Sequence, residues 1–185
     1  MTETGMNTSN PLYGERRPGT VGLPLPGVDV RICGPQGEVL GKRNVGDLQV
    51  RGPNVFSGYW NMAKKTTEDF TSDGFFMTGD QACVDSDGYI SIVGRSKDMV
   101  ISGGLNVYPK EIELLIDELP EVNESAVIGL PDADFGEVVA AVVVLVNDAG
   151  VSEGQIRDAM KARVASFKVP KRVFFVEELP RNAMG

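Results

Sequence analysis

Residues 94–104 (GRSKDMVISGG) join two halves of the chain that have different hydrophobic patterns. Residues 89–93 alternate between buried-type and polar side chains and predict a strand with one buried face. From about Lys110 onwards, apolar residues recur at the spacing of a helix. Glycines at both ends of residues 94–104 let the backbone turn where a side chain would clash. This stretch is either a solvated connector or a hinge whose charged residues contact a ligand, because hinges are short segments that absorb large backbone rotations.

The first half, residues 1–96, predicts a small and mostly antiparallel β unit with many turns. Residues 1–27 show no clear periodic element. The expected strands are residues 28–32, 46–52, 82–84 and 89–93. Residues 85–88 (DSDG) predict the hairpin turn between the last two strands, and residues 62–70 predict one or two helical turns.

The second half, residues 97–185, predicts a separate α+β domain. A helix is expected from Pro109, which suits a first helical turn, to Pro120, which ends it. A second helix is expected after a capping box formed by Ser152 and Gln155, with Val151 and Ile156 placed as a hydrophobic staple. Its apolar stripe is Ile156, Met160, Val164 and Phe167; the expected strands are 125–129, 138–146 and 173–176. The fold class is therefore α+β, with a sheet covered by two helices after a boundary near Lys97.

Composition excludes several classes of function. The 185 residues have a formal net charge of −8, which argues against nucleic acid as the main partner, and no apolar run is long enough to span a membrane. Histidine is absent, which excludes Ser-His and Cys-His nucleophiles and histidine-based zinc sites within this chain. Cys33 and Cys83 lie in apolar, strand-like runs and are interpreted as small buried hydrophobes, which favours a reducing, cytoplasmic setting.

Two polar constellations lie in the first half. Thr2 and Glu3 offer a hydroxyl and a carboxylate beside the flexible Gly5, enough to hold a phosphate oxygen and a hard cation such as Mg²⁺. Asp80, at the break formed by Thr78-Gly79-Asp80, could accept hydrogen bonds from ribose hydroxyls. The alternatives are an ordinary polar segment for Thr2 and Glu3, and a turn-stabilising aspartate for Asp80.

Two more constellations flank the boundary between the halves. Arg95 supplies a guanidinium fork suited to ribose and phosphate oxygens, and its alternative is a surface ion pair worth under about 1 kcal/mol. Ser102, Gly103 and Gly104 leave backbone exposed, so that a ligand chain can pass close by; the alternative is an ordinary turn. Taken singly, each of the four constellations favours its simpler alternative.

Taken together and in this order, the motifs resemble those of the adenylate-forming acyl-CoA synthetase superfamily. The residues that carry the resemblance are METT at 1–4, GDLQVRG at 46–52, GYW at 58–60, TGD at 78–80, GRSKD at 94–98, SGGLNVYPKEIE at 102–113 and PRNAMG at 180–185. The resemblance covers essentially the whole chain. Residues 7–11, 14–19 and 180–185 look most like malonyl-CoA synthetases, also called malonate–CoA ligases.

The resemblance implies two half-reactions and a role for each constellation. A carboxylate and ATP give an acyl-adenylate and pyrophosphate, and the thiol of CoA then displaces AMP. Thr2 would contact the α-phosphate and Glu3 would hold Mg²⁺, while Asp80 and Arg95 would bind the ribose hydroxyls. Lys97 would be the hinge of a mobile small domain, residues 97–185, and residues 1–96 would be the last β subdomain of the large adenylating domain. Ser102, Gly103 and Gly104 would line the pantetheine tunnel.

The chain departs from the family at its ends. It starts at the Thr-Glu motif, and the family's glycine-rich phosphate loop and most of its acyl pocket lie upstream. Residues such as Gly5 and Met6 are expected to belong to the wall of that pocket. It stops at Gly185, where the family's next residue is the lysine that assists adenylation. We therefore expect that the missing N-terminal part of the same enzyme is a partner and that this chain alone forms no acyl-adenylate. Two alternatives stay open: another acyl- or amino-acid-adenylating enzyme, and a non-catalytic module that binds a nucleotide or CoA.

One local basic cluster remains, formed by Lys161, Arg163, Lys168, Lys171 and Arg172. Such a cluster is either a solvated helix face and loop, which is favoured, or a contact surface for the CoA nucleotide.

Overall fold

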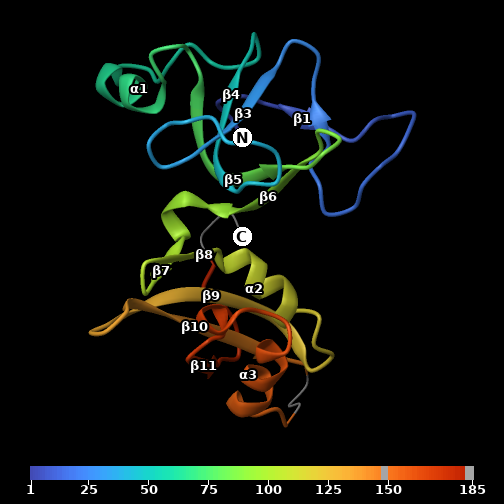
Figure 1. Cartoon of the computed structure of the whole chain (residues 1–185), viewed down its shortest axis with the longest axis vertical. Helices are drawn as coiled ribbons and strands as arrows, with labels where there is room; N and C mark the ends of the chain where they lie inside the picture. Colours follow the sequence, from blue (N-terminus) through green and yellow to red (C-terminus); the bar gives the residue numbers. More distant parts are fainter. Residues whose placement is uncertain (147–149, 182–185) are drawn as a thin grey trace. The chain divides into compact units, whose positions relative to one another are not determined.

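The computed structural model of this chain describes residues 1–146 and 150–181. The chain divides into two compact units, Met1–Ser96 and Lys97–Gly185, which we call unit 1 and unit 2 (Figure 1). Among the described residues, no helix has both the length and the apolar character needed to cross a membrane. Each unit has its own sheet and its own hydrophobic core.

Unit 1 is built on a four-stranded sheet with strands in sequence order. The strands are β3 (Asp29–Cys33), β4 (Gly46–Arg51), β5 (Phe76–Val84) and β6 (Ile90–Arg95). All three pairings are antiparallel, as predicted. A short ladder of β1 (Thr8–Ser9) and β2 (Leu23–Pro24) lies in the segment that shows no sequence periodicity, and α1 (Ala63–Asp69) is the predicted short helix.

The core of unit 1 combines aliphatic strand residues with aromatic rings. Its buried members are Ile32, Leu48, Val50, Phe76, Ala82 and Ile90. Phe76 lies 5.4 Å from Phe56 and 5.3 Å from Phe70, measured between ring centroids. Cys33 is buried as predicted, but Cys83 is only partly buried. The prediction for Cys83 was too simple, because successive strand side chains point to opposite faces and the fully buried position is the neighbouring Ala82.

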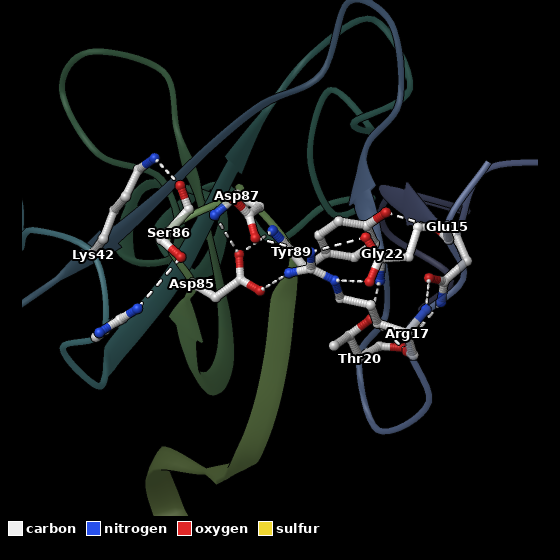
Figure 2. A network of polar contacts seen from close by, with 11 residues as sticks. Glu15, Arg17, Thr20, Gly22, Lys42, Asp85, Ser86, Asp87 and Tyr89 are labelled. Carbon is white, nitrogen blue, oxygen red and sulfur yellow. Dashed lines mark hydrogen bonds and ion pairs between the residues drawn. The ribbon is translucent and has the colours of Figure 1, made fainter.

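A polar network ties the irregular N-terminal segment to the β5–β6 hairpin (Figure 2). The Arg17 guanidinium lies 2.9 Å from Glu15, 2.7 Å from Asp85 and 2.8 Å from Asp87. Its Cζ also lies 4.3 Å from the centroid of the Tyr89 ring. One side chain therefore fixes a loop that has no periodic structure of its own.

The hairpin turn itself is stabilised locally. Asp85 Oδ1 accepts hydrogen bonds from the backbone amides of Asp87 and Tyr89, and Gly88 takes a positive φ of 95°. Lys42 Nζ donates to the carbonyl of Ser86 at 2.7 Å (Figure 2). The predicted turn at residues 85–88 is therefore confirmed.

Over residues 97–146 and 150–181, unit 2 has a five-stranded sheet and two helices. The strands are β7 (Val100–Ser102), β8 (Leu105–Val107), β9 (Val122–Asp132), β10 (Gly136–Leu145) and β11 (Arg172–Phe175). β10 pairs with β7, β9 and β11, and only its pairing with β11 is parallel. The helices are α2 (Pro109–Ile116) and α3 (Glu153–Lys161); the short 3₁₀ turns are η1 (Ser96–Asp98) and η2 (Ser166–Lys168).

The core of unit 2 is almost entirely aliphatic. α2 contributes Ile112 and Ile116, and α3 contributes Ile156 and Met160. The predicted capping box is present, because the Ser152 side chain accepts from the Gln155 amide and Gln155 reaches back to the Ser152 amide.

Two predicted bounds in unit 2 were wrong. α3 ends at Lys161, although the apolar stripe continued to Val164 and Phe167. Both residues still pack against the core from outside the helix, so the pattern marked a buried face and not a continuous helix. β9 is longer than the predicted residues 125–129, because β10 pairs with it from Val122 to Asp132.

Candidate functional site

Asp80 and Arg95, far apart in the sequence, face each other across β5 and β6. They are register partners, and Arg95 Nε lies 3.1 Å from Asp80 Oδ1. Arg95 Nη1 also donates to the carbonyl of Thr78 at 3.3 Å. The ladder shifts register between Gln81 and Ala82, as expected where a strand re-aims its side chains. The two residues predicted to act together are therefore placed together.

The Asp80–Arg95 pair combines a partly buried carboxyl group with a half-exposed guanidinium group. Burial raises the pKa of the Asp80 carboxyl, and the nearby Arg95 charge opposes that rise. The Arg95 side chain is half exposed, so its remaining N–H groups are accessible. The pair thus presents a carboxylate acceptor next to a guanidinium donor.

Glu3 is held by hydroxyl groups on either side of its carboxylate. Thr2 Oγ1 donates to Glu3 Oε2 at 3.0 Å, and the Tyr59 hydroxyl donates to Glu3 Oε1 at 3.3 Å. A backbone hydrogen bond together with these two hydroxyls lowers the pKa of the Glu3 carboxyl. Burial and the Glu3 charge raise the pKa of Tyr59 to about 12, so its phenol remains a donor at neutral pH.

The segment that contains Glu3 is also fixed through its backbone. The Phe56 amide donates to the Glu3 carbonyl at 2.8 Å. Asn54 Nδ2 donates to the Thr4 carbonyl at 2.8 Å and to Asn7 Oδ1 at 2.9 Å. Residues 54–59 therefore serve as the support for residues 3–7.

Thr2, Glu3 and Arg95 line one cleft of about 410 Å³ within unit 1, which we call the Glu3 cleft. Its other lining residues are Met1, Tyr59, Lys65, Asp69, Phe76, Met77, Thr78 and Gly79. A second pocket of about 270 Å³ is lined by Asp80 and by Gly5 and Met6 among others, and Met1 lines both hollows. Arg95 therefore lines the Glu3 cleft, and its partner Asp80 lines the second pocket.

Sequence reasoning missed Tyr59, Lys65 and Asp69. Tyr59 enters the sequence analysis only within the GYW motif at 58–60, with no role assigned to it, and α1 only as a short helix. No spacing signal links these residues to Glu3, because only the folded chain brings residue 59 within hydrogen-bonding distance of residue 3.

The remaining predicted site residues lie at or beyond the boundary between the units. Lys97 is exposed in the middle of η1. Gly103 and Gly104 have φ angles of 58° and 79° and form the two-residue turn of the β7–β8 hairpin, the geometry of a type I′ turn. The buried Ser102 and Gly103 line a pocket of about 290 Å³ within unit 2, together with Phe135, Phe167 and Lys171 among others. Gly104 is not among the residues that line it.

The basic cluster is largely neutralised within unit 2. Lys161 pairs with Asp158 at 2.8 Å, and Lys168 pairs with Glu111 at 2.7 Å. Arg163 pairs with Glu118. Lys171 Nζ lies 3.6 Å from the centroid of the Phe135 ring, beside the pocket that contains Gly103.

Glu3 is the one predicted metal ligand, and its surroundings fit a magnesium ion. Within residues 1–146 and 150–181, no group of three or more acidic, cysteine or histidine side chains could hold a metal without further ligands. Mg²⁺ does not need such a group, because it typically binds one or two carboxylates and the phosphates of its substrate. An ionised Glu3 at the edge of a polar cleft has the chemistry for that arrangement.

Comparisons with known proteins identify the family of the chain. Residues 1–60 match the family of AMP-binding enzymes, and residues 111–185 match the AMP-binding enzyme C-terminal domain. The residues 182–185 that contributed to the malonyl-CoA synthetase resemblance lie outside the described residues.

Several of the relatives are CoA ligases or CoA synthetases. The malonate–CoA ligase of Arabidopsis thaliana is 41% identical over 196 residues, which cover 100% of this chain and 32% of the relative. The ATP-bound MatB of Rhodopseudomonas palustris is 55% identical with a TM-score of 0.95, covering 100% of this chain and 37% of that one. The o-succinylbenzoate CoA synthetase of Bacillus subtilis, in complex with its acyl-adenylate intermediate, is 36% identical with a TM-score of 0.83, covering 90% of this chain and 34% of that one.

This chain spans about a third of the length of these relatives. The fold agrees with the predicted α+β class. The chain therefore belongs to the adenylate-forming AMP-binding enzymes and corresponds to their C-terminal portion.

Proposed function

We propose that this chain is the C-terminal part of an ATP-dependent CoA ligase that activates a small carboxylate through an acyl-adenylate. The observation that supports this most directly is the Asp80–Arg95 pair beside the Glu3 cleft, in a chain that matches both parts of the AMP-binding family. Its partners are then ATP, CoA, the carboxylate and the remaining part of the enzyme.

Asp80 and Arg95 are the ribose-binding residues in this proposal. The two vicinal hydroxyls of a ribose can donate hydrogen bonds to a carboxylate, and their oxygens can accept hydrogen bonds from a guanidinium group. The partly buried Asp80 gains from such partners, because hydrogen bonds to the charged form compensate for its desolvation.

Thr2 and Glu3 are the phosphate and magnesium residues. The Thr2 hydroxyl can turn from Glu3 to an oxygen of the α-phosphate, since both are acceptors. Bound Mg²⁺ would neutralise the charge that develops on the phosphate as the carboxylate attacks. Glu3 stays ionised for this role because its hydrogen bonds lower its pKa.

Lys97 and the turn after β7 belong to the second half-reaction. We assign Lys97 as the hinge about which unit 2, as a mobile domain, would move relative to the adenylating domain that contains unit 1. The Ser102-Gly103-Gly104 turn would line the path of the CoA pantetheine, because its glycines expose backbone where a side chain would obstruct a thiol chain. A Cβ atom at Gly103 would also lie only 3.2 Å from the Phe135 ring.

Malonate is the proposed carboxylate. The support comes from the names of the relatives, which include the malonate–CoA ligase of Arabidopsis thaliana and MatB. The proposed compartment is the cytoplasm, because Cys33 and Cys83 are both free thiols.

Titration of AMP into the purified chain, followed by calorimetry, tests the proposal. Asp80→Asn and Arg95→Ala are expected to weaken AMP binding about tenfold or more, because each removes a hydrogen-bonding partner of the ribose. Asp29→Asn is the matched control, because Asp29 and Arg51 form a similar cross-strand pair on β3 and β4 that lines neither hollow. The proposal fails if the chain binds no AMP, or if the Asp29 variant loses as much affinity as the Asp80 variant.

A further inference from the structure

The Glu3 cleft contains a cation to which the proposed function gives no role. Its charged lining residues are Glu3, Lys65, Asp69 and Arg95. Arg95 is already engaged by Asp80, and Glu3 is the metal ligand of the proposal. The cation without a role in the proposed function is Lys65, on α1.

Lys65 lies close to Tyr59, which contacts Glu3. Its Nζ is 6.0 Å from the centroid of the Tyr59 ring, whose hydroxyl donates to Glu3. Its ion pair is with Asp69, one helical turn later, at 2.7 Å. The ammonium group is therefore held beside the same tyrosine that orients the proposed magnesium ligand.

The ion pair with Asp69 is weak enough for the Lys65 ammonium group to change partner. The Lys65 side chain is 49% exposed and that of Asp69 is 19% exposed, so water and salt reach the pair from the side of the ammonium group and weaken it. A phosphate oxygen carries a negative charge and several lone pairs, and it can replace Asp69 as the partner of the ammonium. The flexible lysine stem allows that exchange without movement of the helix.

The neighbouring lysine shows what a merely solvated position on this helix looks like. Lys64 is 92% exposed, is paired with Glu68 only at 3.8 Å, and does not line the cleft. Lys65 differs in exposure, in its contact with Tyr59 and in facing the cleft. Two adjacent residues of the same type thus occupy different environments.

We propose that Lys65 binds the phosphate chain of ATP beyond the α-phosphate, while Asp80 and Arg95 hold the ribose. This inference rests on the proposed function and adds a residue to it. It assigns to α1 a part in holding the triphosphate and, later, the pyrophosphate product.

The experiment compares ATP and AMP, each with Mg²⁺, in NMR titrations of the purified chain and of two variants. Lys65→Met removes the charge and keeps a long side chain with similar helix propensity, and Lys64→Met is the matched control. We expect Lys65→Met to weaken ATP binding about fivefold or more, the size of one lost charge-assisted contact, and to change AMP binding less than about twofold. Lys64→Met should leave both affinities within about twofold, and Lys65→Arg should retain most of the affinity for ATP.

Three results would overturn the inference. In the first, ATP binding is unchanged by Lys65→Met; in the second, Lys64→Met has an equal effect, which would mean that only overall charge matters. In the third, Lys65→Met weakens the binding of AMP and of ATP by the same factor, which would mean that Lys65 does not contact the phosphates beyond the α-phosphate. These results are distinct from failure of the proposed function, in which the unmodified chain shows no saturable AMP binding and both ideas fall.

Discussion

Units 1 and 2 differ in the interactions that stabilise each of them internally. Unit 1 has a core of six buried hydrophobic residues, with aromatic rings packed around Phe76. The core cluster of unit 2 has thirteen buried members among the described residues, nearly all aliphatic and mostly contributed by the strands and both helices. The smaller core of unit 1 is supplemented by guanidinium groups at its surface.

Three arginines of unit 1 make such contacts with carboxylates and aromatic rings. Arg17 contacts three carboxylates and the Tyr89 ring (Figure 2). Arg31 and Arg51 both lie over the ring of Phe75, with their Cζ atoms 3.8 Å and 4.4 Å from its centroid. Arg17 therefore fixes an irregular loop of unit 1, whereas Arg31 and Arg51 cover Phe75 from the strands β3 and β4.

The largest effect is expected for Phe76→Ala in unit 1. Phe76 is 2% exposed and contacts two other rings, so truncation should lower the free energy of unfolding of unit 1 by about 3–5 kcal/mol. Urea unfolding followed by residue-resolved NMR measures the two units separately. If the two cores are independent, amides of unit 2 keep their unfolding midpoint; equal loss in both units would refute that separation.

Ile112→Ala makes the corresponding test in unit 2. Ile112 is fully buried on α2, and its truncation leaves a cavity that should cost about 2–5 kcal/mol. The same urea series should now show the loss at residues 97–181 and little change at the amides of β3 to β6. A cost below about 1 kcal/mol would show that the aliphatic core can collapse around the deletion.

Ser152→Ala tests the capping box of α3. Its loss should lower the stability of unit 2 by about 1 kcal/mol, because the Gln155 amide loses its acceptor. Hydrogen exchange at the amides of the first turn of α3 reports the change. Ser152→Asp should restore most of the protection, since aspartate is an equally good N-cap.

The smallest effect is expected at Asp73 and depends on pH. Hydrogen bonds from Arg31 lower the pKa of Asp73 from 3.8 to about 2. The folded state therefore favours the ionised carboxyl, and this contribution is present above pH 3.8 and is lost as the pH falls towards 2. Asp73→Asn should lower the urea midpoint of unit 1 at pH 6, and the difference from the unmodified chain should shrink between pH 4 and pH 2. A difference that is constant over this range would contradict the assigned titration.

Much of the fold could be predicted because local chemistry and tertiary packing agree. The DSDG turn, the Ser152 capping box and the apolar spacing of Ile112 and Ile116 each indicate the structure that forms. The predicted extent of α3 was wrong, because a periodic apolar stripe reports the residues that face a core whether or not they share one helix.

The sequence by itself determined the family and the α+β class. It also singled out Thr2, Glu3, Asp80 and Arg95 as candidate site residues, because their motifs follow one another in the order typical of the family. Only the tertiary structure decided which of them meet. Asp80 and Arg95 become neighbours through the β5–β6 register, Tyr59 donates to Glu3 from a loop, and Lys65 of α1 lines the same cleft. The reason is physical: periodicity encodes which face of an element is buried, whereas a site is made of side chains whose proximity depends on strand register and loop closure.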